Sequence, residues 1–120
     1  MSDPFPALFA LSPQVRYVAL LQGRDLRMAS RPGLTGASEA ETDRYEELLV
    51  NPAVLTLLQR RGDLDCGGLD HLWIRYGHFW TGLFPIPGGH LNVGLEPDAD
   101  PKAFESGIRT AITALLKKGN

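Results

Sequence analysis

Three histidines and one cysteine are the residues of this sequence best suited to bind a metal ion. His71 and His90 stand at the start of two predicted strands, His78 lies between them, and Cys66 precedes all three. Their spacings match no ligand motif, and no predicted helix carries the HExxH pair of a metalloprotease. Lone histidines in strands are more often surface or cap residues. We therefore expect no metal site.

The remaining chemistry-bearing motifs are also missing. Cys66 is followed by two glycines, and no Lys, Arg or His stands beside it to lower the pKa of a nucleophilic thiol. The chain contains no phosphate-binding loop, no GxGxxG after a strand, no GxSxG elbow and no carboxylate pair in a clear setting. We expect a protein that is not an enzyme and has no cofactor.

Length and composition indicate one ordinary domain, residues 1–120. The 120 residues are 43% hydrophobic with a net charge of −2, which gives no reason to expect nucleic acid or a membrane as the main partner. A single cysteine excludes an internal disulfide and fits a reducing compartment. With no signal-peptide pattern and no membrane-length apolar run, we expect a cytoplasmic protein.

Two groups of strands form the predicted scaffold. Residues 67–97 hold three short apolar runs punctuated by Gly77 and by Pro87-Gly88-Gly89, which predicts an antiparallel meander. Residues 15–31 predict a hairpin with a central first strand and an edge second strand. The arginines of this hairpin suit either a docking patch for an acidic partner or an edge protected from pairing, and we favour the second interpretation. They are Arg16, Arg24, Arg27 and Arg31.

Helices are predicted before, between and after the strands. Residues 1–14 predict a short apolar segment that covers part of the core, although a frayed end is the alternative. Ser38 and Glu41 form a capping-box pattern, and Asn51-Pro52 predicts a break followed by a second helix, Pro52 to Arg61, ended by Gly62. Asp100-Pro101 predicts the cap of a final amphipathic helix. Its expected buried residues are Phe104, Ile108, Ala111, Ile112 and Leu115.

One sheet edge and one helix suggest a surface for self-association. The predicted edge Leu69 to Tyr76 carries no lysine or proline that would block strand pairing, and the Pro52 to Arg61 helix has more leucine surface than one sheet can cover. We therefore expect a homodimer. The residues expected near its axis are Leu55, Leu58, Leu69 and Trp73.

The element order, together with RYVALLQGRDLRMASR, ELLVNPAVLTLLQRRG and RYGHFWTGLFPIPGGHLNVGLEPDADP, resembles the roadblock (dynein light chain) family of prokaryotic type. The resemblance implies an α+β fold of roadblock/profilin-like shape, with a five-stranded antiparallel sheet between helices in the order (short α)ββα(α)βββα. It also implies a dimer with no enzymatic centre. The implied role is to regulate or scaffold a small Ras-like GTPase, as the similar gliding-motility proteins do, or a signalling or motor complex.

The alternative function is a sensor domain of PAS, GAF or profilin-like shape. The meander aromatics, Trp73 and Trp80 among them, would then line a small-molecule pocket. Such a sensor needs an enclosed pocket between the sheet and the Ser38 to Arg61 helices, whereas an interaction module fills that space with side chains.

Overall fold

A computed structural model describes residues 3–34, 36 and 39–118 of the chain. Five strands form one antiparallel sheet in the order β2-β1-β5-β4-β3, which confirms the predicted α+β fold and the joining of hairpin and meander. The strands are β1 (Val15–Gln22), β2 (Asp25–Ser30), β3 (Leu72–Arg75), β4 (Trp80–Ile86) and β5 (Gly89–Leu95). The helical elements are α1 (Pro4–Phe9), α2 (Ala40–Tyr45), the π turn η1 (Glu46–Val50), α3 (Asn51–Asp65), the 3-10 turn η2 (Pro101–Phe104) and α4 (Glu105–Lys118).

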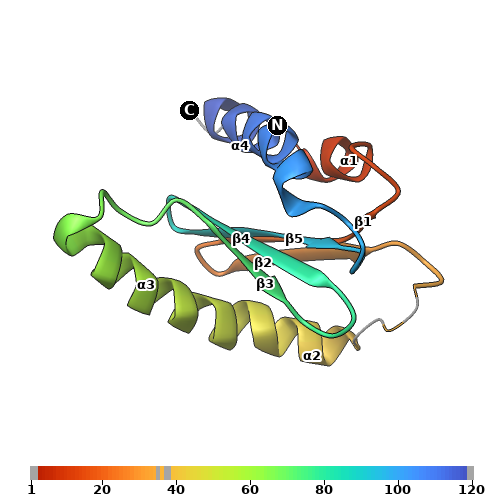
Figure 1. Ribbon diagram of the computed structural model, residues 1–120, viewed down its shortest axis with the longest axis horizontal. Coiled ribbons are helices and arrows are strands. Elements are labelled where there is room, and N and C mark those ends of the chain that lie inside the picture. Colours follow the sequence, from red (N-terminus) through yellow and green to blue (C-terminus); the bar gives the residue numbers. More distant parts are fainter. Residues whose placement is uncertain (1–2, 35, 37–38, 119–120) are drawn as a thin grey trace.

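Helices cover the sheet on both faces (Figure 1). On one face α1 and α4 bury the apolar core, to which Phe5 and Leu8 of α1 and Ile108 of α4 contribute. Alternation along the strands sends Val93 to this core and His90 and Asn92 to the opposite face, where α2 and α3 lie. The sheet thus has an apolar face and a more polar face.

The helices that cover the polar face differ from the prediction at both ends of the second predicted helix, Pro52 to Arg61. The expected break at Asn51-Pro52 is wrong, because α2, the π turn and α3 run on without interruption, and we call residues 40–65 the helical arm. The helix meets Pro52, which has no N–H, directly after the π turn, in which the Asn51 N–H donates to the carbonyl oxygen of Glu46 five residues earlier. The side chain of Asn51 is buried instead of capping. Glu39 is the N-cap of α2, and Ser38 of the expected capping box lies outside the described residues.

The expected helix end at Gly62 is also wrong. The helix continues to Asp65, and the N–H groups of Cys66 and Gly68 both donate to the carbonyl oxygen of Gly62 at 3.0 Å. A Cβ at residue 62 would lie 2.9 Å from the carbonyl carbon of Gly68. Glycine is therefore needed here because the following loop crosses the helix closely, and not because the helix stops.

Candidate interaction surface

A buried carboxylate attaches the helical arm to the sheet. Glu47 in the π turn is fully buried, and its Oε1 lies 2.7 Å from Nε2 of His90 and accepts from Nδ2 of Asn51 at 3.0 Å. Its Oε2 accepts from the hydroxyl of Tyr17 at 2.8 Å and from Nδ2 of Asn92 at 2.7 Å. One side chain therefore joins the arm to the two central strands β1 and β5.

The charge state of this network follows from its hydrogen bonds. Burial by itself would raise the pKa of Glu47, but the hydrogen bonds from His90, Tyr17, Asn51 and Asn92 outweigh it and lower that pKa below its ordinary value. Burial and the charge of Glu47 raise the pKa of Tyr17, which keeps its hydroxyl a neutral donor. The site therefore holds an ionised, fully hydrogen-bonded carboxylate at neutral pH.

His90 contradicts the expectation that the strand histidines are surface or cap residues. It is only 1% exposed, because the arm covers it and Glu47 provides its hydrogen-bond partner. His71 is half-buried and His78 is exposed. Sequence reasoning also missed Glu47, although a Glu four residues before Asn51 on one helical face was a possible signal.

The arm exposes apolar side chains that the sheet does not cover. Leu57 is 68% exposed, and it lies two residues, or about 200° of helical turn, from the buried Leu55. Leu58 lies one turn from Leu55 but is 37% exposed. It therefore lies at the margin of the helical face that packs on the sheet, and we call this position the margin. The exposed apolar residues of the arm are Tyr45, Leu48, Leu49, Leu57, Leu58 and Leu64.

Leu58 and a groove lie on opposite sides of the sheet-facing stripe of α3. One side of α3 borders this groove. Pro52 and Gln59 of α3 line it on one side, and Leu21 of β1 and His90 of β5 line it on the other. Leu58 lies on the other side of Leu55 from this groove, whereas Leu57 points away from the sheet. In the sheet order, β4 and β3 lie on the side of β5 away from β1. Figure 1 shows α3 beneath the sheet.

Strand β3 is an edge strand, as predicted. In the described part of the chain it pairs with β4 and has no strand on its other side. The register Leu72↔Leu83 and Ile74↔Thr81 places Leu72 and Ile74 on the arm's face of the sheet, where both are half-buried.

The four residues expected at the dimer axis do not lie together on one surface. Leu55 is buried at 4% exposure beneath the arm, and Leu69 is half-buried in the loop that crosses Gly62. Trp73 lies on the other face of the sheet, where its Nε1 donates to Glu105 of α4 at 2.9 Å and its ring meets Phe84 edge to face. Of the four, Leu58 is the one exposed on the surface of the arm.

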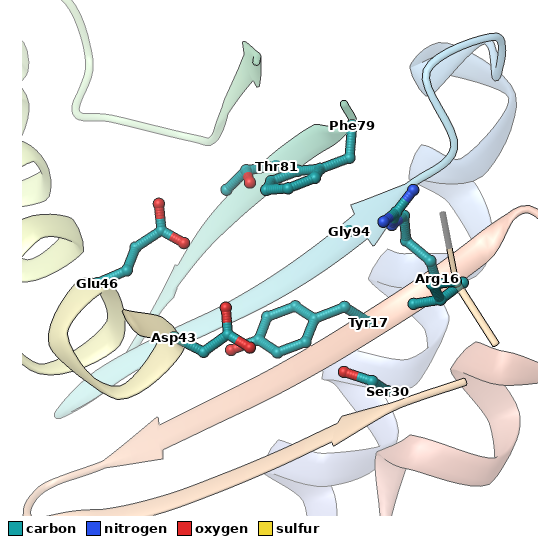
Figure 2. Close-up of a pocket in the computed structure, with 9 residues that line it drawn as sticks. Arg16, Tyr17, Ser30, Asp43, Glu46, Phe79, Thr81 and Gly94 are labelled. Atoms are coloured by element: carbon teal, nitrogen blue, oxygen red, sulfur yellow. The ribbon is translucent and has the colours of Figure 1, made fainter. Parts of the chain in front are cut away.

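Two hollows lie between the arm and the sheet, a small cavity and the open groove beside Pro52 and His90, which measures about 280 Å³. A cavity of about 30 Å³ lies near Tyr17, Glu46 and Thr81, which is room for roughly one water molecule. Figure 2 shows Tyr17 reaching from β1 toward Asp43 and Glu46 of the arm. Burial and the neighbouring charge of Glu47 raise the pKa of Glu46. Side chains fill this part of the arm–sheet contact, whereas the groove beside Pro52 and His90 is open.

The arginines of the hairpin are mostly engaged within the chain. Arg31 donates to the carbonyl oxygens of Val15, Phe9 and Ser12, and Arg27 pairs with Asp3 at 3.0 Å. These contacts hold the N-terminal segment against the sheet. The interpretation that they protect an open edge is therefore incomplete, because two of them bind the segment that precedes β1.

Comparisons with known proteins add no family to these observations. No family model matches the sequence, and no curated protein matches it.

Within residues 3–34, 36 and 39–118, no three His, Cys, Asp or Glu side chains are grouped so that they could hold a metal ion. No helix in that part of the chain is long and apolar enough to cross a bilayer. The exposed thiol of Cys66 contacts Asp65.

Proposed function

We propose that this protein is a non-enzymatic, dimeric interaction module of the cytoplasm that regulates or tethers a small Ras-like GTPase or a signalling complex. The observation that carries the proposal is the combination of an open edge strand, β3, with a neighbouring helix whose leucines face solvent. Open edges and contiguous apolar patches are the features by which soluble proteins bind other chains. The GTPase part of the proposal rests on the resemblance to roadblock proteins.

A second copy of the chain fits this surface by symmetry. Two β3 strands related by a two-fold axis would pair antiparallel, and the same axis would bring the two α3 helices together. The exposed surfaces of Leu58 on α3 and of Leu72 and Ile74 on β3 would then be buried in both copies. A stable interface of this kind buries about 800 Å² per partner.

The sensor alternative requires an enclosed pocket between the arm and the sheet. A ligand pocket for a small molecule usually measures about 300–1,000 Å³. The cavity near Tyr17 measures about 30 Å³, and the groove beside Pro52 and His90 measures about 280 Å³ but is open to solvent. The side chains of Glu47, Asn51, His90 and Asn92 occupy the space instead. We therefore retain the interaction module as the proposed function.

Two variants of matched exposure test the surface. Leu58→Glu changes a residue of the margin that is 37% exposed, and Leu116→Glu changes a residue on the opposite face that is 39% exposed. We expect Leu58→Glu to sediment as a folded monomer and Leu116→Glu to remain a dimer. Two variants that behave alike would contradict the assignment of the interface.

The GTPase role needs a separate assay. The release of fluorescent nucleotide from a small Ras-like GTPase of the same organism can be measured with and without the protein. A change in the rate of release or of hydrolysis supports the proposal. Unchanged rates, together with no binding to either nucleotide state, would contradict this role and leave the dimer to be judged by its own test.

A further inference from the structure

The open groove between the helical arm and the sheet has a preformed, mainly apolar lining. Leu55 of α3 and Leu21 of β1 line it from opposite sides, and they are 4% and 8% exposed, so packing already holds both in place. The end of the groove is backbone, because Gly88 and Gly89 add no side chains. The N–H of Gly23 donates to the carbonyl oxygen of Gly88 at 2.8 Å, which fixes this end.

One polar atom of a buried side chain is left for a ligand in this groove. His90 is 1% exposed, and its Nε2 lies 2.7 Å from the ionised carboxylate of Glu47. Because a carboxylate only accepts hydrogen bonds, Nε2 carries a proton. The other ring nitrogen, Nδ1, has no hydrogen-bond partner among the residues that the structure describes, and it is not one of their enclosed, unpaired atoms. Nδ1 therefore opens onto the groove that His90 lines, in an orientation fixed by Glu47.

The lining selects a neutral ligand. Among the described residues that line the groove, none is Lys, Arg, Asp or Glu, so no such side chain there offsets the dehydration of a strongly charged molecule. A proton on Nδ1 of His90 would be balanced by the carboxylate of Glu47 and would give no net positive site. A hydroxyl group matches Nδ1 in either protonation state, because a hydroxyl both donates and accepts hydrogen bonds.

The volume of the groove limits the size of the ligand. The groove measures about 280 Å³. An apolar cavity of about 150 Å³ already accommodates benzene in another protein, so a single ring with a small substituent fits here.

We propose that this groove binds a small neutral molecule with an apolar ring and a hydroxyl group, the ring against Leu21 and Leu55 and the hydroxyl bonded to Nδ1 of His90. Such a ligand contacts the arm and the sheet at once, so it stabilises the state in which the arm lies on the sheet. The groove is open, unlike the enclosed pocket of a sensor domain. It lies on the other side of Leu55 from Leu58, so the proposal does not rest on the proposed dimer.

Titration with para-cresol, followed by NMR of the isotope-labelled full chain, tests the site. Toluene is the matched control, because it keeps the ring and the methyl group but lacks the hydroxyl. Para-cresol should shift the backbone amide signals of Gly88 and Gly89 and the Nδ1 signal of His90. Toluene should bind roughly fivefold more weakly, the effect of one hydrogen bond, and should leave the Nδ1 signal in place. Saturating para-cresol should also slow hydrogen exchange of the α3 amides.

Two tryptophan variants locate the site. Gln59→Trp fills the groove from a half-buried lining position and should abolish the shifts. Leu57→Trp adds the same ring on the exposed side of α3 and should preserve them. If circular dichroism shows that Gln59→Trp does not fold, Thr56→Trp at an exposed lining position takes its place. Equal affinities for para-cresol and toluene, shifts that survive in the filled groove or vanish in Leu57→Trp, or no shifts in the parent would overturn the proposal.

Discussion

Replacing Glu47 by alanine tests whether the buried carboxylate holds the helical arm on the sheet. The change leaves four donors without their acceptor, the side chains of Tyr17, Asn51, His90 and Asn92. Each buried donor left unsatisfied costs about 1–3 kcal/mol, although water entering the space offsets part of the sum. Removing one member of a buried charged network typically costs about 3–5 kcal/mol. We therefore expect the free energy of unfolding to fall by about 4 kcal/mol.

Urea unfolding followed by circular dichroism measures this loss. With a slope of about 2 kcal/mol per molar urea, the midpoint should fall by about 2 M. Glu47→Gln retains one oxygen acceptor and should cost roughly half as much. Glu41→Ala on the exposed side of α2 is the control, and it should stay within about 0.5 kcal/mol of the parent. A Glu47→Ala variant that unfolds at the same urea concentration as the control would refute the reasoning.

Three further changes have definite expected outcomes. Ile108→Asp places an unpaired charge at a fully buried position of α4 and should lower the free energy of unfolding by several kcal/mol. Thr113→Asp, on the exposed side of α4, should not. Equal melting temperatures of the two variants would contradict the assignment of the buried face of α4. Gly62→Ala should lower the free energy of unfolding, measured in urea, by about 1–3 kcal/mol, because the added Cβ would lie too close to the backbone of Gly68. An unchanged stability would mean that the loop moves away from the helix without cost. Because the pKa of Glu47 is lowered in the folded state, its contribution is complete above its ordinary pKa and is lost as pH falls through the folded-state value. Acid titrations of the parent should therefore show a loss of stability that Glu47→Gln lacks, and parallel curves would contradict this assignment.

The scaffold could be predicted because its signals are local. Alternation of apolar residues, Gly-rich turns and the Asp100-Pro101 cap fix the strands, the hairpin and the final helix, and the hydrogen bond from the Lys102 N–H to Asp100 is present at 3.2 Å. These features depend on neighbours in sequence, so they are readable before the fold is known. The edge position of β3 was instead part of the topology that the family resemblance implies, because it depends on the pairing of β1 with the distant β5.

The parts that failed depend on residues far apart in sequence. Glu47 and His90 are 43 residues apart, and neither local pattern shows that they meet. Without this pairing, Asn51-Pro52 was predicted as a helix break and His90 as a surface residue. The face of the sheet to which Trp73 points depends on the register with Gly82, which no spacing within β3 alone determines.

The mass of the protein in solution tests the central claim most directly. Light scattering at micromolar concentration should give about 26 kDa, twice the 13.1 kDa of one chain. A mass that stays near 13.1 kDa as the concentration is raised into the high micromolar range would contradict a dimeric interaction module.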